Sequence, residues 1–453
     1  MHVHLISTYD LGRQPFGLAS PAAWLRAAGF DVTCTDLAVE RLDEASVASA
    51  ALIAIHLPMH TATRLATALV PRVRAIQPRA HLCFYGLYAP PNEVWLRAQG
   101  AGTILGGEFE AGLVSLARGL REGGIEVPGE STISLERQRF LVPDRDGLAP
   151  LVRYAHLYLA DRRRRTVGYT ESSRGCKHRC RHCPVVPIYN GAFRIVQREV
   201  VLEDVAQQVD KGAEHITFGD PDFFNGIGHA MAIARGIHKR HPDLTWDVTI
   251  KVEHLLRHRD LLRELAECGC LFVTSAVESL DDRVLELLDK GHTREDFELA
   301  VRLCRDAGLT LIPTFVAFHP WITPRGYMEL LSRIAELDLV DHVASVQLAL
   351  RLLVPRESKL LELPEVRALV GPFDDEALLH PWTHPDPRVD ELQRAVEARV
   401  EKGTAAGIGR REIFADVRDL AASAVELSDL PPLEEAWRSA RVTVPYLTEP
   451  WHC

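Results

Sequence analysis

Residues 176–183 read CKHRCRHC and place three cysteines and two histidines within eight positions. The cysteines are Cys176, Cys180 and Cys183, with the spacing C-x3-C-x2-C, and they follow a β-rich run at residues 166–172. Three thiolates on one loop can hold three irons of a cubane [4Fe-4S] cluster and leave the fourth iron without a protein ligand. The spacing therefore predicts an iron-sulfur site with one reactive iron.

Zinc is the alternative metal for this segment. His178 or His182 could join the three cysteines and complete a four-ligand structural zinc site. Zinc modules usually supply their ligands as two separated pairs, and the chain has no second C-x2-C pair elsewhere. The spacing favours the iron-sulfur cluster over zinc.

The sequence around this loop alternates between strand-like and helical stretches. Between about residues 166 and 365, five helical stretches separate six strand-like runs, which are 166–172, 215–220, 245–251, 271–279, 310–318 and 344–353. Such a series of β/α units curls toward a barrel and carries its chemistry at the C-terminal ends of the strands. We expect a partial (βα)6 barrel with the cysteine loop at its catalytic edge.

The rest of the chain divides into three further regions. Residues 1–122 also alternate between strand-like and helical runs, which predicts a Rossmann-like parallel sheet flanked by helices. Residues 123–165 are rich in Gly, Pro and charge and predict a linker, whereas residues 366–453 predict a helical C-terminal region. The expected fold class is therefore α/β, with the barrel at residues 166–365.

Composition excludes several classes of protein. The net charge of -10 gives no general attraction to nucleic acid, and no apolar run is long enough to span a membrane. The nine cysteines are an odd number and mostly scattered, which does not fit a disulfide framework. We expect a cytoplasmic protein with no nucleic-acid or membrane partner.

The cysteine loop resembles the C-x3-C-x-φ-C loop of the radical S-adenosylmethionine (SAM) superfamily. This resemblance implies a [4Fe-4S] cluster that binds SAM and cleaves it reductively to a 5'-deoxyadenosyl radical. It also implies SAM-binding roles for later segments of the barrel, although Ala276 replaces a glycine that is usual in the ribose segment. The implied SAM contacts are His182 toward the adenine, Gly219 and Asp220 with Asp222 toward the ammonium, Lys251 and Glu253 toward the carboxylate, and Glu278 and Ser279 toward the ribose.

Two more residues near strand ends are candidates for substrate binding. His319 follows the fifth expected strand, and Arg351 lies in the sixth. A packed or surface histidine and a structural ion pair are the alternative interpretations of these two residues.

The order of regions resembles the cobalamin-binding class of the same superfamily, which has a parallel α/β domain before the barrel. Gly86, Gly107 and Glu108 follow expected strands of the front region and are the implied cobalamin contacts. The segment D-x-H-x-x-G, which would supply a histidine to cobalt, does not occur. Fold analogy alone makes cobalamin one of two open outcomes.

The end of the sequence, VPYLTEPWHC, resembles a radical SAM family named for a Cys-Cys-Ala-Glu-Pro or Cys-selenocysteine-Ala-Glu-Pro tail. Cys453 matches the first residue of that tail. The resemblance implies a redox-active, catalytic Cys453 and, if a selenocysteine codon follows, a selenoprotein. A plain chain end with one thiol is the alternative.

These observations predict a radical SAM enzyme that acts on a small-molecule substrate and receives electrons from a donor such as a flavodoxin or ferredoxin. A cobalamin-dependent methyltransferase and an enzyme that transfers the aminocarboxypropyl group of SAM to a soft acceptor such as arsenic, selenium or sulfur are alternative enzymes. A non-catalytic zinc module that binds partners through Arg162–Arg165 is an alternative of another class.

Overall fold

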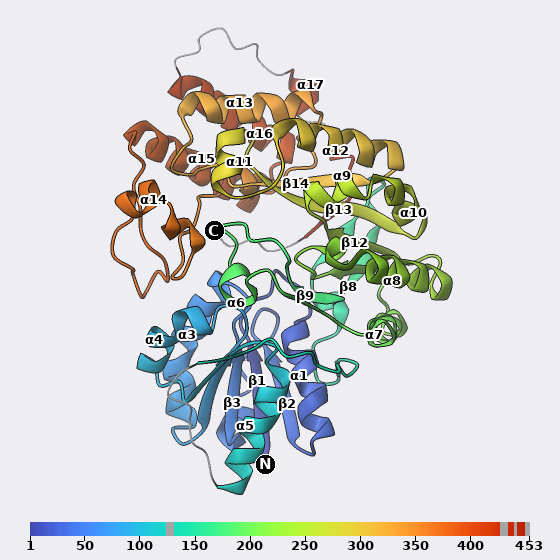
Figure 1. Cartoon of the computed structure of the whole chain (residues 1–453), viewed down its shortest axis with the longest axis vertical. Coiled ribbons are helices and arrows are strands. Elements are labelled where there is room, and N and C mark those ends of the chain that lie inside the picture. The colour runs from blue at the N-terminus through green and yellow to red at the C-terminus, as the bar shows by residue number, and fades with distance from the viewer. Residues whose placement is uncertain (124–130, 426–433, 439–441, 449–453) are drawn as a thin grey trace.

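The computed structural model describes residues 1–123, 131–425, 434–438 and 442–448. It is an α/β protein with two largely parallel sheets, as the sequence predicts (Figure 1). In the view of Figure 1 the first sheet and its helices form the lower part of the molecule, and the second sheet and the C-terminal helices form the upper part. Cys453 lies outside the described residues.

The first sheet and the helices on both of its faces are called the front domain here. Its strands run in parallel in the order β2-β1-β3-β4-β5-β6. Helices α1 and α5 pack on one face, and α2, α3 and α4 pack on the other. The elements are β1 (His2–Ser7), α1 (Phe16–Ala27), β2 (Asp31–Asp36), α2 (Glu44–Ser49), β3 (Leu52–His56), α3 (His60–Ile76), β4 (His81–Tyr85), α4 (Glu93–Ala98), β5 (Thr103–Gly107), α5 (Glu110–Glu122) and β6 (Thr132–Ser134).

The second sheet is the half-barrel, in the order β14-β13-β12-β11-β8-β7-β15. Its strands are parallel from β14 to β8, and β7 and β15 extend the β8 edge in antiparallel pairing. The strands are β7 (His156–Tyr158), β8 (Arg164–Thr170), β11 (His215–Phe218), β12 (Thr245–Thr249), β13 (Cys270–Glu278), β14 (Thr310–Phe315) and β15 (Tyr446–Leu447). The barrel helices are α7 (Arg198–Asp210), α8 (Ile227–Arg240), α9 (Val252–Arg257), α10 (Leu262–Glu267), α11 (Asp282–Leu287), α12 (Arg294–Ala307) and α13 (Pro324–Glu336).

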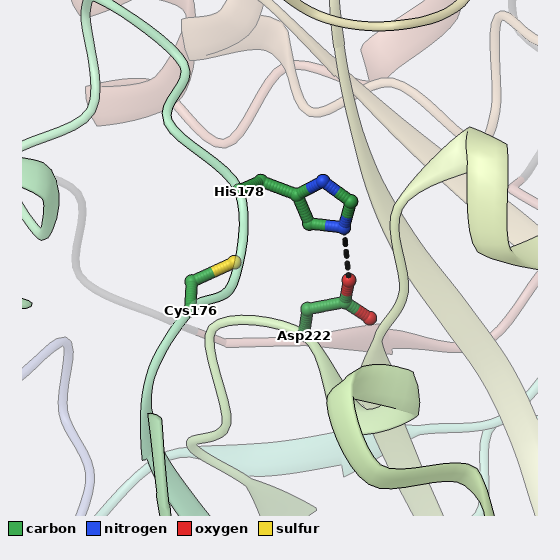
Figure 2. Close-up of side chains that lie close together, drawn as sticks. All are labelled: Cys176, His178 and Asp222. Carbon is green, nitrogen blue, oxygen red and sulfur yellow. Dashed lines mark ion pairs between the residues drawn. The ribbon is translucent and has the colours of Figure 1, made fainter. Parts of the chain in front are cut away.

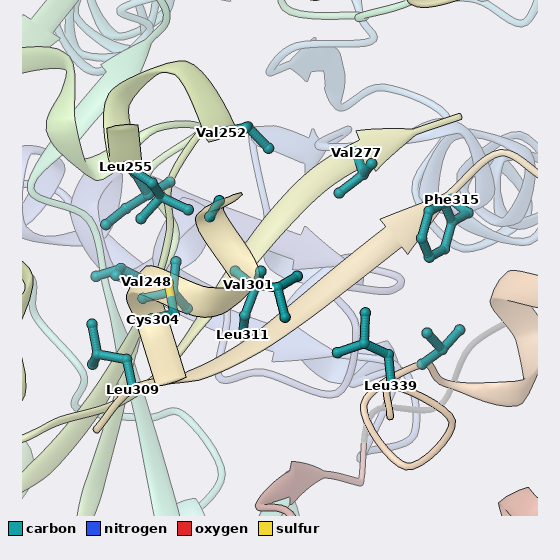
Figure 3. Packing of buried hydrophobic residues seen from close by; sticks show 14 of the residues in the cluster. Val248, Val252, Leu255, Val277, Val301, Cys304, Leu309, Leu311, Phe315 and Leu339 are labelled. Atoms are coloured by element: carbon teal, nitrogen blue, oxygen red, sulfur yellow. The ribbon is translucent and has the colours of Figure 1, made fainter. Parts of the chain in front are cut away.

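The core of the half-barrel lies between its sheet and the outer helices. Figure 3 shows Val248 and Leu311 from the strands packed with Val301 and Cys304 from α12. Cys268 and Cys270 are buried as well. The C-terminal helices are α14 (Pro364–Leu369), α15 (Pro387–Ala405), α16 (Arg410–Ala424) and α17 (Glu435–Arg438).

The prediction of a sixth barrel strand at residues 344–353 is wrong. A 3-10 helix, Ser345–Leu348, occupies this segment, and only an isolated bridge between Phe318 and Arg351 remains of the strand pairing. The Gln347 side chain accepts a hydrogen bond from the backbone N–H of Phe315 at 3.0 Å, in place of a backbone partner. An apolar run of this length does not distinguish a strand from a short helix.

The stretch expected to be a linker contributes to both sheets through β6 and β7. It also carries Arg145, whose guanidinium makes two 2.8 Å bonds to Asp204 of α7 and one 2.7 Å bond to Gln14 of the front domain. These buried bonds join the two halves of the molecule. Within the described part of the chain, none of the helices combines the length and the apolar character needed to cross a membrane.

Candidate functional site

The cluster loop, residues 176–183, begins just after the short strand β9 (Ser173–Gly175), which pairs with β10 (Phe193–Ile195), and it precedes α6 (Val186–Tyr189). It therefore lies beyond the C-terminal end of β8, where a barrel places its chemistry. Asn225 accepts a hydrogen bond from the backbone N–H of Lys177 at 3.2 Å and fixes the start of the loop.

The three loop cysteines are reduced and close enough to influence one another. Burial raises the pKa of Cys176 to about 11, and the charge of Cys180 adds to this rise. Burial raises the pKa of Cys183 to about 12, with further contributions from Cys180 and Cys176. Crowded, partly buried thiols resist ionisation unless a cation stabilises the thiolates, so this donor set fits a metal cluster.

His178 points from the loop toward the barrel strands, as Figure 2 shows. Its Nε2 lies 3.5 Å from Asp222 Oδ2, and His254 Nδ1 lies 2.6 Å from the same oxygen. Ligand atoms of Cys176, His178 and Asp222 all lie within 4.8 Å of one another. A single metal ion such as zinc, instead of a cluster, could bind to these three residues.

His182 points to the end of β13. Its Nε2 lies 3.0 Å from Glu278 Oε1, and Lys290 Nζ donates to the same oxygen at 3.4 Å. Burial alone would raise the pKa of Glu278, but the charges of Lys290 and His182 outweigh it and lower the pKa to about 2. Glu278 has φ 72°, and the pairing of β13 with β14 shifts register beside it. This rare conformation for a non-glycine residue turns the carboxylate toward the cluster loop.

Gly219 and Asp220 follow β11 and support the approach to the cluster loop. Asp220 accepts hydrogen bonds from the Ser172 backbone N–H at 2.7 Å, the Ser172 hydroxyl at 2.6 Å and the Ser173 hydroxyl at 2.7 Å. A Cβ on Gly219 would lie 1.8 Å from the Tyr169 hydroxyl oxygen, so only glycine fits there. Asp220 thus positions the strand that leads into the loop.

Lys251 and Glu253 lie together after β12. Lys251 Nζ is 3.6 Å from Glu253 Oε2 and 3.2 Å from His178 Nδ1. Glu253 also pairs with Arg257 one helical turn later, at 2.5 Å. The two residues therefore border the loop.

A cavity of about 460 Å³, called the strand-end cavity here, opens beyond the ends of β13 and β14. It brings together Glu278, Ser279 and His319 among its lining residues. Burial lowers the pKa of His319 to about 4, so its ring is neutral near pH 7. The volume lies within the range of about 300–1,000 Å³ that is typical of small-molecule sites.

Arg351 makes a structural ion pair, which is the alternative that the sequence left open for it. Its guanidinium binds Asp390 Oδ1 at 2.7 Å, donates to the Trp382 carbonyl at 2.8 Å and stacks 3.6 Å from the Trp382 ring centroid. These contacts hold α15 against the barrel and occupy the guanidinium.

Arg174 joins the cluster loop to the front domain. It lies in β9, two residues before Cys176, and its guanidinium binds Glu110 at 2.7 Å, Glu171 at 2.7 Å and Glu108 at 3.4 Å. Burial raises the pKa of Glu108, although the charge of Arg174 opposes this rise. Glu108, which the resemblance implies as a cobalamin contact, therefore takes part in a buried ion pair between the domains.

A second cavity, of about 220 Å³, lies between the front domain and the half-barrel and is called the interdomain cavity here. Gly86 and Gly107 line it, whereas Glu108 does not. His56 fills the adjacent space, because a Cβ on Gly17 would lie 2.1 Å from its ring. The cavity is smaller than those that hold drug-sized molecules, and a corrinoid is larger than such molecules. In this arrangement the interdomain cavity is smaller than a corrinoid, and we derive no step through that cofactor.

Sequence reasoning missed several residues that shape the site. Lys290 lies in the loop after α11, and Arg174 and Arg181 lie in or beside the cluster loop. Arg181 donates to the backbone carbonyl of Leu287 at 2.8 Å, which anchors the loop on the C-terminal end of α11. The density of arginines around the loop was a visible signal, but their partners are distant in the sequence.

Residues 170–333 match the model of the Radical SAM superfamily. This part of the chain is similar to the radical SAM domain. The match begins at the end of β8, includes the cluster loop and extends into α13.

Curated relatives and solved structures agree with this match. The hopanoid C-3 methylase of Methylococcus capsulatus is 25% identical over 326 residues, which cover 68% of this chain and 62% of the relative. The bacteriochlorophyllide d C-8(2)-methyltransferase of Chlorobaculum tepidum is 27% identical over 188 residues, which cover 37% of this chain and 40% of the relative. Both matches span less than two thirds of the relative's length.

The cobalamin-dependent SAM radical enzyme OxsB, solved with aqua-cobalamin and SAM bound, superposes with a TM-score of 0.69 at 15% identity. The superposition covers 89% of this chain and 67% of that one. At this identity the likeness establishes the fold, which combines the front domain with the half-barrel.

Proposed function

We propose that this protein is a radical SAM enzyme in which Cys176, Cys180 and Cys183 hold a [4Fe-4S] cluster. The observation that carries the proposal is the position of three thiols with the spacing C-x3-C-x2-C on one loop at the catalytic edge of the half-barrel. The neighbouring strand-end cavity has the volume of a small-molecule site and a polar lining. The family match covers both features.

SAM would lie between the cluster loop and the strand ends. Glu278, Ser279 and His182 would contact its nucleoside, Lys251 and Glu253 its carboxylate, and Gly219 and Asp220 the region of its ammonium. When bound, the cluster supplies the electron that cleaves SAM to methionine and a 5'-deoxyadenosyl radical. The protein's share is to hold SAM in one orientation and to exclude water from the reacting atoms.

The residues around the loop keep this geometry fixed. Arg181 anchors the loop to α11, and Asp220 holds Ser172 and Ser173 just before it. Glu278 stays ionised because Lys290 and His182 compensate its burial, so it can accept hydrogen bonds from sugar hydroxyls. We infer a small-molecule substrate and an electron donor such as a flavodoxin or ferredoxin as partners.

The first test is anaerobic reconstitution with iron and sulfide, followed by dithionite and SAM. The intact chain is expected to bind about four irons with sulfide and to release 5'-deoxyadenosine. The triple variant Cys176→Ala, Cys180→Ala, Cys183→Ala should do neither, whereas Cys268→Ala, a change in a core cysteine, should keep both. One zinc without sulfide would contradict the proposal, and methylthioadenosine in place of deoxyadenosine would indicate aminocarboxypropyl transfer.

Methyl transfer with cobalamin is the second candidate. It is favoured by the methylase and methyltransferase names of the two relatives and by the cobalamin-bound neighbour. The interdomain cavity opposes it, because a corrinoid would require the two domains to separate. Incubation of the purified chain with hydroxocobalamin, followed by gel filtration, tests this candidate. A stoichiometric corrin band would support it, and the absence of the band would remove it. The role of Cys453, and membership of the family with a Cys-Cys/Sec-Ala-Glu-Pro tail, remain predictions.

A further inference from the structure

A third cavity, of about 290 Å³, lies against the inner face of the half-barrel sheet and is called the lumen cavity here. The outer face of this sheet is apolar and covered by helices, as Figure 3 shows for Val248 and Leu311. The inner face instead presents polar side chains on neighbouring strands, which include Thr217, Asp247, Thr249, Thr274 and Thr314. Phe272 and Ile312 also line the cavity, so polar and apolar side chains meet there. A cavity that directs a few polar groups inward among apolar ones is the arrangement expected of a small-molecule binding site.

Asp247 places a carboxylate at one wall of this cavity. It is 4% exposed, and its Oδ2 accepts from the Thr217 hydroxyl at 2.6 Å and lies 2.9 Å from His215 Nε2. Both contacts use the same oxygen. Within the described residues no hydrogen bond reaches Oδ1, so a buried acceptor is left for a ligand that carries a positive charge.

Arg410, the first residue of α16, supplies a cation at another wall. It donates to the backbone carbonyl of Asp341 at 2.8 Å and lies 5.0 Å from the ring centroid of Tyr446 in β15. The carboxylate of Asp341 pairs with Arg411 instead, at 2.8 Å. In the described part of the chain, Arg410 therefore has no carboxylate partner, and loss of hydration lowers its pKa. A desolvated guanidinium is suited to bind an anion.

Gln347 adds a third directed group. It is 4% exposed, and its Oε1 accepts from the Phe315 N–H, which orients its amide NH2 group as a donor. No described residue accepts from that NH2 group, and Gln347 lines the cavity together with Asp247 and Arg410. The walls thus offer one free carboxylate oxygen and two kinds of N–H donor.

We propose that the lumen cavity binds the substrate and that this substrate is a small amino acid, with its ammonium at Asp247 and its carboxylate at Arg410 and Gln347. A simple anion would leave Asp247 Oδ1 without a hydrogen-bond donor, and a simple amine would leave Arg410 without a carboxylate partner. The volume suits a molecule of this size. The inference rests on the proposed function, since it names the substrate class of the same enzyme.

The position of the cavity agrees with this role. It shares Gly219 and Arg13 with the interdomain cavity, which reaches Gly175, the residue before Cys176. A ligand in the lumen cavity would therefore lie on the side of the sheet from which the cluster loop is reached. Tyr446 of β15 lines the same cavity.

The test measures binding to the full-length, anaerobically reconstituted chain without SAM. The probes are the proteinogenic amino acids and the linear ω-amino acids from glycine to 6-aminohexanoate. Calorimetry measures the affinity of the chain for each of them. Every binder is compared with its deaminated acid and its decarboxylated amine, for example 5-aminopentanoate with pentanoate and butylamine. At least one zwitterion is expected to bind about tenfold or more tightly than either analogue, because each lost charge removes a charge-assisted hydrogen bond.

Two variants locate the charges. Asp247→Asn is expected to weaken binding of the zwitterion and the amine about tenfold or more while leaving the acid unchanged. Arg410→Gln is expected to weaken the zwitterion and the acid and leave the amine unchanged. Asp243→Asn and Arg302→Gln, changes at exposed positions, are the matched controls and should not alter binding.

The inference is overturned if no zwitterion binds better than its acid and amine analogues, a comparison that needs only the unmodified chain. It is also overturned if folded Asp247→Asn and Arg410→Gln bind the zwitterion as the unmodified chain does. Deoxyadenosine formation without added amino acid is measured on the same preparation. If no deoxyadenosine forms, the proposed function is contradicted. If deoxyadenosine forms but no amino acid binds, only this inference is contradicted.

Discussion

The strand ends of the half-barrel and those of the front domain both border the crevice between the domains, but different side chains occupy the two edges. At the half-barrel edge, Glu278, Ser279 and His319 line a cavity of about 460 Å³. At the front-domain edge the cavity measures about 220 Å³, and the His56 ring and the ion pair between Arg174 and Glu110 lie there instead.

Parallel sheets often combine two properties, an edge placed for ligand binding and side chains at that edge that bind the ligand. In this protein the two sheets differ in the second property. The topology places loops and glycines at the C-terminal edge of both sheets, which is where α/β proteins bind ligands. Whether an edge binds one depends on the side chains that occupy it. In the front domain the carboxylates beyond β5 bind Arg174, so this edge holds the cluster loop in place rather than exposing an open site.

Substitution of Arg174 is the test of this comparison with the largest expected effect. In Arg174→Met, Glu108 and Glu110 remain buried without their cation, which costs about 3–5 kcal/mol in the free energy of unfolding. The loss should be smaller at pH 5 than at pH 8, because burial already raises the pKa of Glu108 and its protonation relieves the unpaired charge. Urea unfolding of the full chain at both pH values measures this.

The control for this change is Arg198→Met. Arg198 pairs with Glu199 on the surface, where solvent screens the interaction, so stability should hardly change. A similarly small loss for Arg174→Met would mean that the carboxylates of the front domain are hydrated, and that its edge is open enough to receive a ligand.

Much of this site is predictable from local sequence. The cysteine spacing and the run at residues 166–172 place the cluster loop after the first barrel strand, and the structure agrees. The acidic residues after β11, β12 and β13 were also expected at this edge, because the ends of parallel strands meet there. These features depend on short spacings and on alternation, which a single sequence displays.

Other features depend on contacts between distant segments. Arg174 binds Glu108 and Glu110 from another domain, and no spacing rule connects them. The expected strand at residues 344–353 became a 3-10 helix because a side chain, Gln347, satisfies the N–H of Phe315. Such tertiary hydrogen bonds override the local preference of an apolar run.

A smaller effect would sharpen the description of the front-domain edge. Burial, together with the charge of Arg174, lowers the pKa of His56 to about 3. The folded chain therefore binds fewer protons than the unfolded chain between about pH 3 and pH 6.5, so this residue makes stability rise with pH in that window. From pH 7.5 to pH 5 it should remove about 2 kcal/mol of the free energy of unfolding.

His56→Phe keeps a ring beside Gly17 but cannot be protonated, so the variant should lose about 2 kcal/mol less stability than the unmodified chain over the same pH change. His238→Phe, at an exposed position, should leave the pH dependence as it is. Urea unfolding at pH 7.5 and pH 5 gives both values. An unchanged pH dependence in His56→Phe would mean that water or a ligand reaches the histidine ring. The front-domain edge would then be open like that of the half-barrel, and the small interdomain cavity would no longer argue against a corrinoid.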